Sequence, residues 1–203
     1  MKTIVTKLAV ALASVLAMSV CAAQSAAPPA ARAGAPAAAP MTLTTTGWMD
    51  GDVIPVKYTQ AVRNPVSPAL VWTNVPAGTQ SLVLHFHDPD VSKDKTTADQ
   101  VHWLMWNMPP TLTGLSENVP MGAELPDGSR QISASGQVYR GPGAAATGPY
   151  HHYTFEIYAL DIKLDSIQPA ANELDTRVKV FAAMQGHVLG KAVMFGLFRR
   201  PPA

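Results

Sequence analysis

Short apolar or alternating runs follow one another along residues 41–160, and clusters of Pro, Gly, Asn and Asp separate them. Several runs carry β-branched and aromatic residues, which suit the pleated surface of a sheet. The pattern therefore predicts a mainly β domain. Its runs are MTLTTTGW at 41–48, VIPVKYT at 53–59, ALVWTNV at 69–75, SLVLHFH at 81–87, VHWLMWNM at 101–108 and HHYTFEIYAL at 151–160.

The apolar period changes after residue 170. Leu174, Val178 and Phe181 recur at the spacing of one helical face. Asn172 has the side chain of an N-cap, and Gly186 is suited to end a helix. We therefore predict one helix between these two residues.

Residues 109–150 are rich in Pro, Gly and Ser and show little periodicity. We predict mostly loop there, with a short strand near residues 130–133. The tail VLGKAVMFGLFRR, residues 188–200, fits either a second helix or a final strand. Gly190 and Gly196 disfavour a helix, so the prediction is a strand.

Residues 1–23 have the composition of an export signal. Two lysines give a basic start, and the apolar run from Leu8 to Val20 is too short to span a bilayer. Cys21 is the single cysteine and lies inside this signal, so the exported protein is expected to lack thiols and disulfides. We predict export to a bacterial periplasm. A lipoprotein is the alternative, with membrane attachment only if Cys21 is lipidated.

Residues 24–40 are mostly Ala and Pro without apolar periodicity, which is typical of an extended linker. The folded domain is therefore expected to cover residues 41–203. Of the 203 residues, 47% are hydrophobic, and the formal net charge is only +1. This composition indicates a globular domain and gives no basis for a nucleic-acid partner.

Histidines gather at the ends of the predicted strands, where alternate side chains share one face. Asp88 falls on the apolar face of its strand with Leu84 and Phe86, and His85 and His87 fall on the opposite face. Five of the six histidines occupy such strand-end positions: His85, His87, His102, His151 and His152.

The same alternation groups His102 with Leu104 and Trp106, and it groups His151 with Tyr153. Each of these two imidazoles then lies at the mouth of an apolar face. A nearby carboxylate can accept one ring N–H and leave the other nitrogen for a ligand, and Tyr153 can add a hydroxyl. The alternative is that each histidine only satisfies a local backbone group.

Gly141, Pro142 and Gly143 form a turn in which the backbone can approach a ligand closely. Consecutive N–H groups in such a turn can make a concave site for an anion. A plain connection between two strands is the alternative.

Two further kinds of site stay open. His85 and His87 form an H-x-H pair, which can bind zinc or copper with a third ligand that the sequence does not identify. A hydrolase would use His102 or His151 as a general base oriented by Asp88, but no nucleophile motif accompanies them. We therefore predict a non-catalytic protein without metal or cofactor, and keep both alternatives.

The ordered motifs are similar to those of the phosphatidylethanolamine-binding protein family. The likeness is to its bacterial members, often described as Raf kinase inhibitor-like, and it extends from about Val53 to the C-terminus. The motifs are IPVKYT at 54–59, NPVSPALVW at 64–72, VPAGTQSLVLHFHDPD at 75–90, VHWLMWNMP at 101–109, GPGAAATGPYHHYTFEIYALD at 141–161 and MQGHVLGKAVMFGLF at 184–198.

The resemblance implies an antiparallel, Greek-key, β-sandwich-like fold with one or two C-terminal helices. It also implies a small pocket for the phosphate groups of lipids or nucleotides, or for other anions. By the position of the motifs, the ligand-binding residues are Asp88, His102, Gly141, Pro142, Gly143, His151 and Tyr153.

We therefore predict that the protein binds phosphate, a phospholipid head group or a carboxylate. In this hypothesis His102 and His151 donate to the anion, Tyr153 adds its hydroxyl, and the turn adds N–H groups. Some members of the family inhibit kinases or proteases, so an unidentified protein partner is the alternative, bound by residues 109–150 and the pocket rim.

The chain departs from the family pattern at three places. They are Val91–Ser92, Ala144–Ala145 and His152, all expected at the rim of the pocket.

Overall fold

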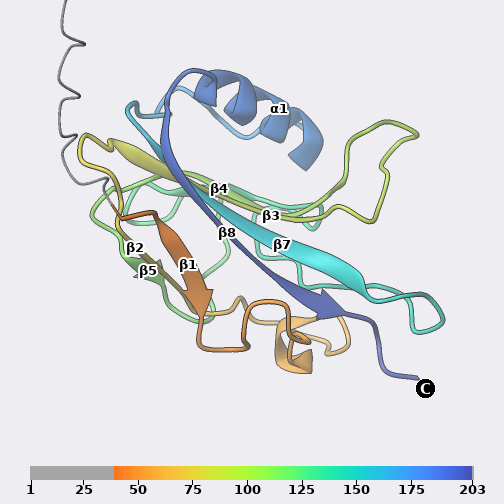
Figure 1. Cartoon of the computed structure of the whole chain (residues 1–203). Helices are drawn as coiled ribbons and strands as arrows, with labels where there is room; N and C mark the ends of the chain where they lie inside the picture. The colour runs from red at the N-terminus through yellow and green to blue at the C-terminus, as the bar shows by residue number, and fades with distance from the viewer. Residues whose placement is uncertain (1–38, 203) are drawn as a thin grey trace, which may run out of the picture. The chain divides into compact units, whose positions relative to one another are not determined.

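The computed structural model describes residues 39–202 (Figure 1). The predicted export signal, residues 1–23, lies outside the described residues, as does all of the predicted linker except residues 39 and 40. Within the described part of the chain, no helix has both the length and the apolar character needed to cross a membrane.

Two antiparallel β-sheets form the domain, which confirms the predicted mainly β fold. The smaller sheet has the strand order β1-β2-β5, and the larger has the order β6-β4-β3-β7-β8. The strands are β1 (Thr42–Thr45), β2 (Leu70–Thr73), β3 (Ser81–Asp88), β4 (Gln100–Met108), β5 (Gly114–Leu115), β6 (Arg130–Ile132), β7 (His151–Leu160) and β8 (Val188–Phe198).

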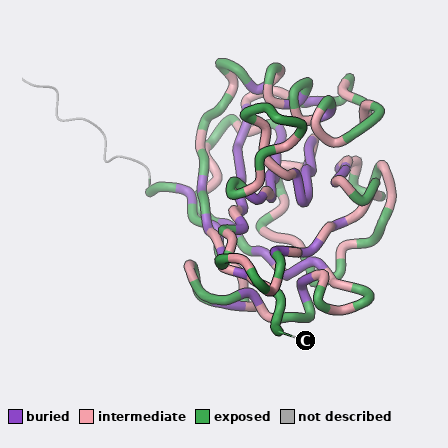
Figure 2. Tube along the Cα trace, turned by 90° about the vertical axis from the view of Figure 1, so that its right-hand side faces the viewer, coloured by how far each residue is buried: buried purple, intermediate pink, exposed green. Residues whose placement is uncertain are grey.

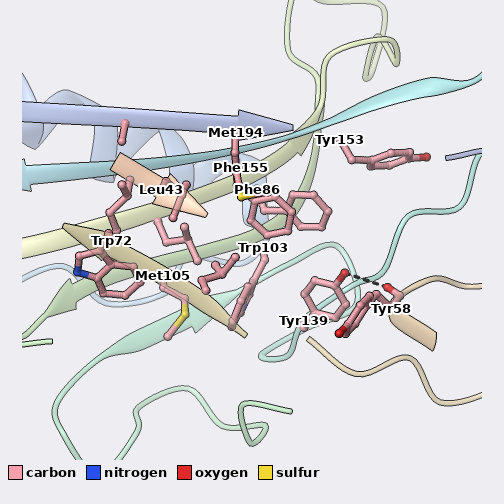
Figure 3. Packing of buried hydrophobic residues seen from close by; sticks show 14 of the residues in the cluster. Leu43, Tyr58, Trp72, Phe86, Trp103, Met105, Tyr139, Tyr153, Phe155 and Met194 are labelled. Carbon is pink, nitrogen blue, oxygen red and sulfur yellow. Dashed lines mark hydrogen bonds between the residues drawn. The ribbon is translucent and has the colours of Figure 1, made fainter. Parts of the chain in front are cut away.

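Aromatic residues fill the space between the two sheets. Leu43 of β1 and Trp72 of β2 belong to one cluster with Phe86, Trp103 and Phe155 of the larger sheet (Figure 3). Both faces of β3 are buried, which is why its sequence is a nearly continuous apolar run. Figure 2 shows buried residues in the middle of the domain and exposed residues along its loops.

The one α-helix of residues 39–202, α1 (Glu173–Met184), covers the other face of the larger sheet (Figure 1). The side chain of Asn172 caps it by accepting a hydrogen bond at 2.8 Å from the backbone N–H three residues on. Gly186 follows the helix with a φ of 82°, so both predicted ends are confirmed. The buried face differs from the prediction, because Val178 is 66% exposed and Val180 is buried instead.

Residues 53–59 do not form the predicted strand. Pro55 lacks an N–H group, and the chain turns there into a short 3-10 helix, Val56–Tyr58. Val53 still pairs with the larger sheet, through an isolated parallel bridge to Leu197 of β8.

Residues 109–150 are mostly loop, as predicted, and β6 lies where the short strand was expected. The tail forms β8, which pairs with β7 and confirms the strand prediction. Gly196 is required in β8 because a Cβ there would collide with the side chain of Ile54.

Candidate functional site

At one end of the larger sheet, the last residues of β3 lie between the first residues of β4 and the first residues of β7. Polar residues from these strand ends therefore meet around a hollow of about 250 Å³. We call it the strand-end hollow. It is lined by Gln60, Asp88, Val91, Gln100, His102, Arg140, Gly143, Ala144, Ala145, His151 and Tyr153.

A β-bulge in β4 brings His102 into the strand-end hollow. The pairing of β4 with β3 is shifted between Val101 and Trp103, so His102 is an extra residue on β4. The predicted grouping of His102 with Leu104 and Trp106 is therefore wrong. Strict alternation fails at the bulge, and His102 faces the hollow while those two side chains pack under α1.

Asp88 fixes the ring of His151. Nδ1 of His151 lies 2.9 Å from Oδ2 of Asp88, which is only 2% exposed. Oδ1 of Asp88 accepts a hydrogen bond from the N–H of Asp90 at 3.0 Å, and Asp90 in turn accepts one from the N–H of His152 at 2.6 Å. Because a carboxylate only accepts, Nδ1 of His151 carries a hydrogen and Nε2 is left for a ligand.

His102 is a neutral acceptor in this hollow. Its Nδ1 lies 3.0 Å from the carbonyl oxygen of Arg140, so Nδ1 carries the hydrogen and Nε2 presents a lone pair. Burial lowers the pKa of His102 to about 4. At neutral pH the ring therefore does not donate to an anion, contrary to the prediction, and His151 remains for that role.

The hydroxyl of Tyr153 accepts hydrogen bonds from the N–H groups of Gly143 and Ala144 at 3.1 and 2.9 Å. The N–H group of Gly143, which was predicted to bind an anion, is thus occupied by the tyrosine. Burial, together with the charge of Asp88, raises the pKa of Tyr153, so its hydroxyl stays protonated. With its oxygen already accepting twice, the hydroxyl is left as a donor.

Gly141 and Pro142 do not line the strand-end hollow. A Cβ on Gly141 would lie 2.5 Å from the carbonyl oxygen of Tyr58 and 2.9 Å from Cα of Thr59. Their carbonyl oxygens accept hydrogen bonds from Gln60, at 2.6 Å from Nε2 and at 2.8 Å from the backbone N–H. These two residues pack the turn against residues 58–60, so the structure gives them a packing role outside the strand-end hollow.

Replacing Gly141 by alanine is expected to lower the free energy of unfolding by about 1–3 kcal/mol, because the new methyl group overpacks against main chain. The carbonyl of Tyr58 that it would meet already accepts a hydrogen bond from Tyr139 at 2.9 Å (Figure 3). Urea unfolding measures the change. Gly148→Ala is the matched control, since its nearest new contact is 3.8 Å away. Equal stability of the two variants would contradict the packing role.

Gln60, Gln100 and Arg140 line the hollow although the sequence pattern did not single them out. Arg140 donates from Nη1 to Oγ of Ser135 at 2.9 Å, and its buried Nε has no hydrogen-bond partner among the described residues. Arg140 could have been predicted from the sequence, because its cationic side chain comes directly before the glycine turn. The two glutamines reach the hollow only through tertiary contacts, and no local pattern marks them.

Comparison with known proteins supports the same family as the motifs. The sequence model described as phosphatidylethanolamine-binding protein matches residues 44–199. A UPF0098 protein of Methanothermobacter thermautotrophicus is 44% identical over 162 residues, which cover 79% of this chain and 99% of that protein. A UPF0098 protein of Aquifex aeolicus is 31% identical, with 79% and 89% covered.

Solved structures agree on the fold. A phosphatidylethanolamine-binding protein homologue from Chlamydia trachomatis has a TM-score of 0.62 at 27% identity, covering 78% of this chain and 97% of that one. Escherichia coli YbcL has the same TM-score of 0.62 at 23% identity, with 79% and 99% covered.

The matched region contains every residue that lines the strand-end hollow. Two of the departures from the family pattern, Val91 and Ala144–Ala145, lie at this hollow as expected. Together, the ordered motifs, the fold and the matched length lead to one conclusion: the chain belongs to the phosphatidylethanolamine-binding protein family.

Proposed function

We propose that the protein is an exported, non-catalytic binding protein for small anions that carry a phosphate group. The observation that carries this proposal is the grouping of the Asp88–His151 pair with Arg140 and Tyr153 at one hollow. An arginine, a tyrosine hydroxyl and an imidazole held by a carboxylate are the donors that a phosphate requires.

His151 is the group whose protonation couples to binding. Asp88 holds its Nδ1–H, so Nε2 donates to a ligand only when the ring is protonated. An anion beside the ring favours that protonated form. Binding of a constant-charge anion is therefore expected to take up a proton and to weaken as the pH rises.

The size of the hollow favours a head group over a whole lipid. Its volume of about 250 Å³ is below the ~300–1,000 Å³ that is usual for larger ligands. Nε2 of His102 adds an acceptor beside the donors. Such a mixture suits a phosphate that carries its own hydrogen, or a head group that carries an ammonium as well as a phosphate.

Isothermal titration calorimetry with glycerophosphoethanolamine, inorganic phosphate and acetate tests the proposal. Titrations in two buffers of different ionisation enthalpy report proton uptake. We expect the phosphate compounds to bind with proton uptake and acetate to bind more weakly. Asp88→Asn is expected to weaken phosphate binding about 10–100-fold, the equivalent of the ~1.5–3 kcal/mol of a hydrogen bond to a charged group.

Asp161→Asn is the matched control, because Asp161 forms a similar pair with His187 at 2.8 Å away from the hollow. It is expected to bind like the parent. Asp88 also repels an anion, so tighter binding by Asp88→Asn would show that repulsion prevails over its hold on His151. That result, or the absence of phosphate binding, would contradict the proposal.

A further inference from the structure

A second group of histidines and carboxylates lies on the opposite face of the larger sheet, under α1. His85 and His87 extend from β3, as predicted for that face, and Glu156 extends from β7 directly beside His85. With Asp99 and Arg177 they line a hollow of about 350 Å³, which we call the α1 hollow.

A carboxylate lies beside each imidazole. Nδ1 of His87 lies 2.6 Å from Oδ2 of Asp99, which also forms an ion pair with Arg177. Nδ1 of His85 lies 3.4 Å from Oε2 of Glu156. Because a carboxylate accepts, Nδ1 of His87 carries a hydrogen and its Nε2 presents a lone pair. In His85 it is Nδ1 that faces Glu156.

The Nε2 atoms of both rings are buried and unpaired. Nε2 of His85 and Nε2 of His87 have no hydrogen-bond partner among the described residues, and His85 is only 3% exposed. The rings stack with centroids 4.2 Å apart, so the two imidazoles lie side by side. A buried polar atom without a partner loses its hydration and gains no hydrogen bond in exchange. The lone pair on Nε2 of His87 beside the carboxylate of Glu156 indicates a partner that takes electron pairs, which is what a metal cation does.

We propose that His85, His87 and Glu156 bind a zinc ion. Ligand atoms of the three residues lie within 4.8 Å of one another. Oε2 of Glu156 is 3.8 Å from Nε2 of His87 and 3.4 Å from Nδ1 of His85. Both distances are close to the ~3.3 Å between ligand atoms of a tetrahedral zinc site with bonds of about 2.0–2.1 Å. Two imidazoles and one carboxylate leave the fourth position open toward the α1 hollow.

Neighbouring residues hold these ligands in place through hydrogen bonds. Asp99 orients His87 through its Nδ1–H. Tyr158 donates to Oε2 of Glu156 at 2.7 Å, and Lys191 donates to Oε1 at 2.5 Å. Outer hydrogen bonds of this kind fix the orientation of ligating side chains at metal sites.

Coordination requires one ring to turn. The planes of His85 and His87 are 12° from parallel, whereas a metal ion lies in the plane of each ring that binds it. Rotation of His85 about its Cβ–Cγ bond would bring the rings out of parallel and leave the contact of His87 with Asp99 in place, and the preferences of that torsion are broad.

The test uses the full chain, produced without an affinity tag and with Cys21→Ser so that no thiol binds metal. Calorimetry with Zn²⁺ alone is expected to show one ion per chain at low-micromolar concentration. Co²⁺ is expected to give the visible absorption of a four-coordinate site. His87→Gln and Glu156→Gln should each abolish both signals, and Asp99→Asn should weaken zinc binding about 10–100-fold.

His187→Gln is the matched control, because it removes an imidazole paired with a carboxylate at 2.8 Å elsewhere on the domain. It should bind zinc like the parent. No binding at low-micromolar zinc, or unchanged binding by Glu156→Gln, overturns the proposal. Loss of binding in Asp88→Asn would place the ion at the other group of ligands and overturns it as well.

Circular dichroism identifies a variant that fails to fold. Glu156→Gln tests the same site without removing a histidine, so a folding failure of His87→Gln leaves the experiment decisive. Zinc binding that persists in Glu156→Gln counts against the site whatever the behaviour of the histidine variant.

Discussion

Replacing Phe86 by alanine is expected to lower the free energy of unfolding by about 3–5 kcal/mol. The ring is fully buried, and it stacks on Phe155 with centroids 3.8 Å apart and on Tyr139 at 5.7 Å (Figure 3). Alanine would leave a cavity between the two sheets, and strands held by hydrogen bonds on both sides cannot close it.

The same ring lies behind the strand-end hollow, since its centroid is 5.4 Å from that of His102 and 6.2 Å from that of Tyr153. Urea unfolding measures the loss. Tyr150→Ala is the control: this tyrosine is 43% exposed and pairs with Arg199, so its removal should cost less than about 1 kcal/mol. A similarly small loss in Phe86→Ala would show that the space between the sheets can collapse.

The free energy of unfolding is expected to fall as the pH is lowered from about 6.5 toward 4, with about 3 kcal/mol of the loss due to His102. Burial lowers the pKa of His102 to about 4 in the folded chain, while the unfolded chain takes up this proton near 6.5. Between these values the unfolded state binds more protons, so acid favours unfolding. The contribution of His102 to stability is therefore fully present above about pH 6.5, and it is lost as the pH falls from about 6.5 to about 4.

His102→Asn isolates this contribution. The asparagine amide can donate to the carbonyl oxygen of Arg140 in place of Nδ1, and it does not titrate. Chemical denaturation at pH values between 7 and 4 should show that the variant loses about 3 kcal/mol less than the parent. Parallel stability profiles for the two proteins would contradict the burial of a neutral His102.

Local pattern determined much of this protein. Alternation along β3 and β7 placed Asp88 and His151 on one face and His85 and His87 on the other, because both strands are regular there. The cap residue Asn172 fixed the start of α1, since a cap depends only on the first turn of its own helix. The ordered motifs were sufficient to predict the family and the mainly β fold.

Tertiary structure decided how the candidate sites are built. A bulge in β4 turned His102 toward the hollow, and alternation cannot foresee an extra residue whose position depends on pairing with β3. The hydroxyl of Tyr153 took the N–H groups of Gly143 and Ala144, a contact set by the packing of a long loop.

The histidines under α1 also show what local pattern predicts and what only tertiary contacts decide, because Glu156 and Asp99 reach them from other parts of the chain. The sequence offered His85 and His87 as a pair, and only the pairing of β3 with β7 supplied the carboxylate of Glu156 beside them. Spacing along the chain carries information about neighbours in one strand or helix. Which distant side chains meet depends on strand register and on the packing of the whole core, so it was decided only when the sheets came together.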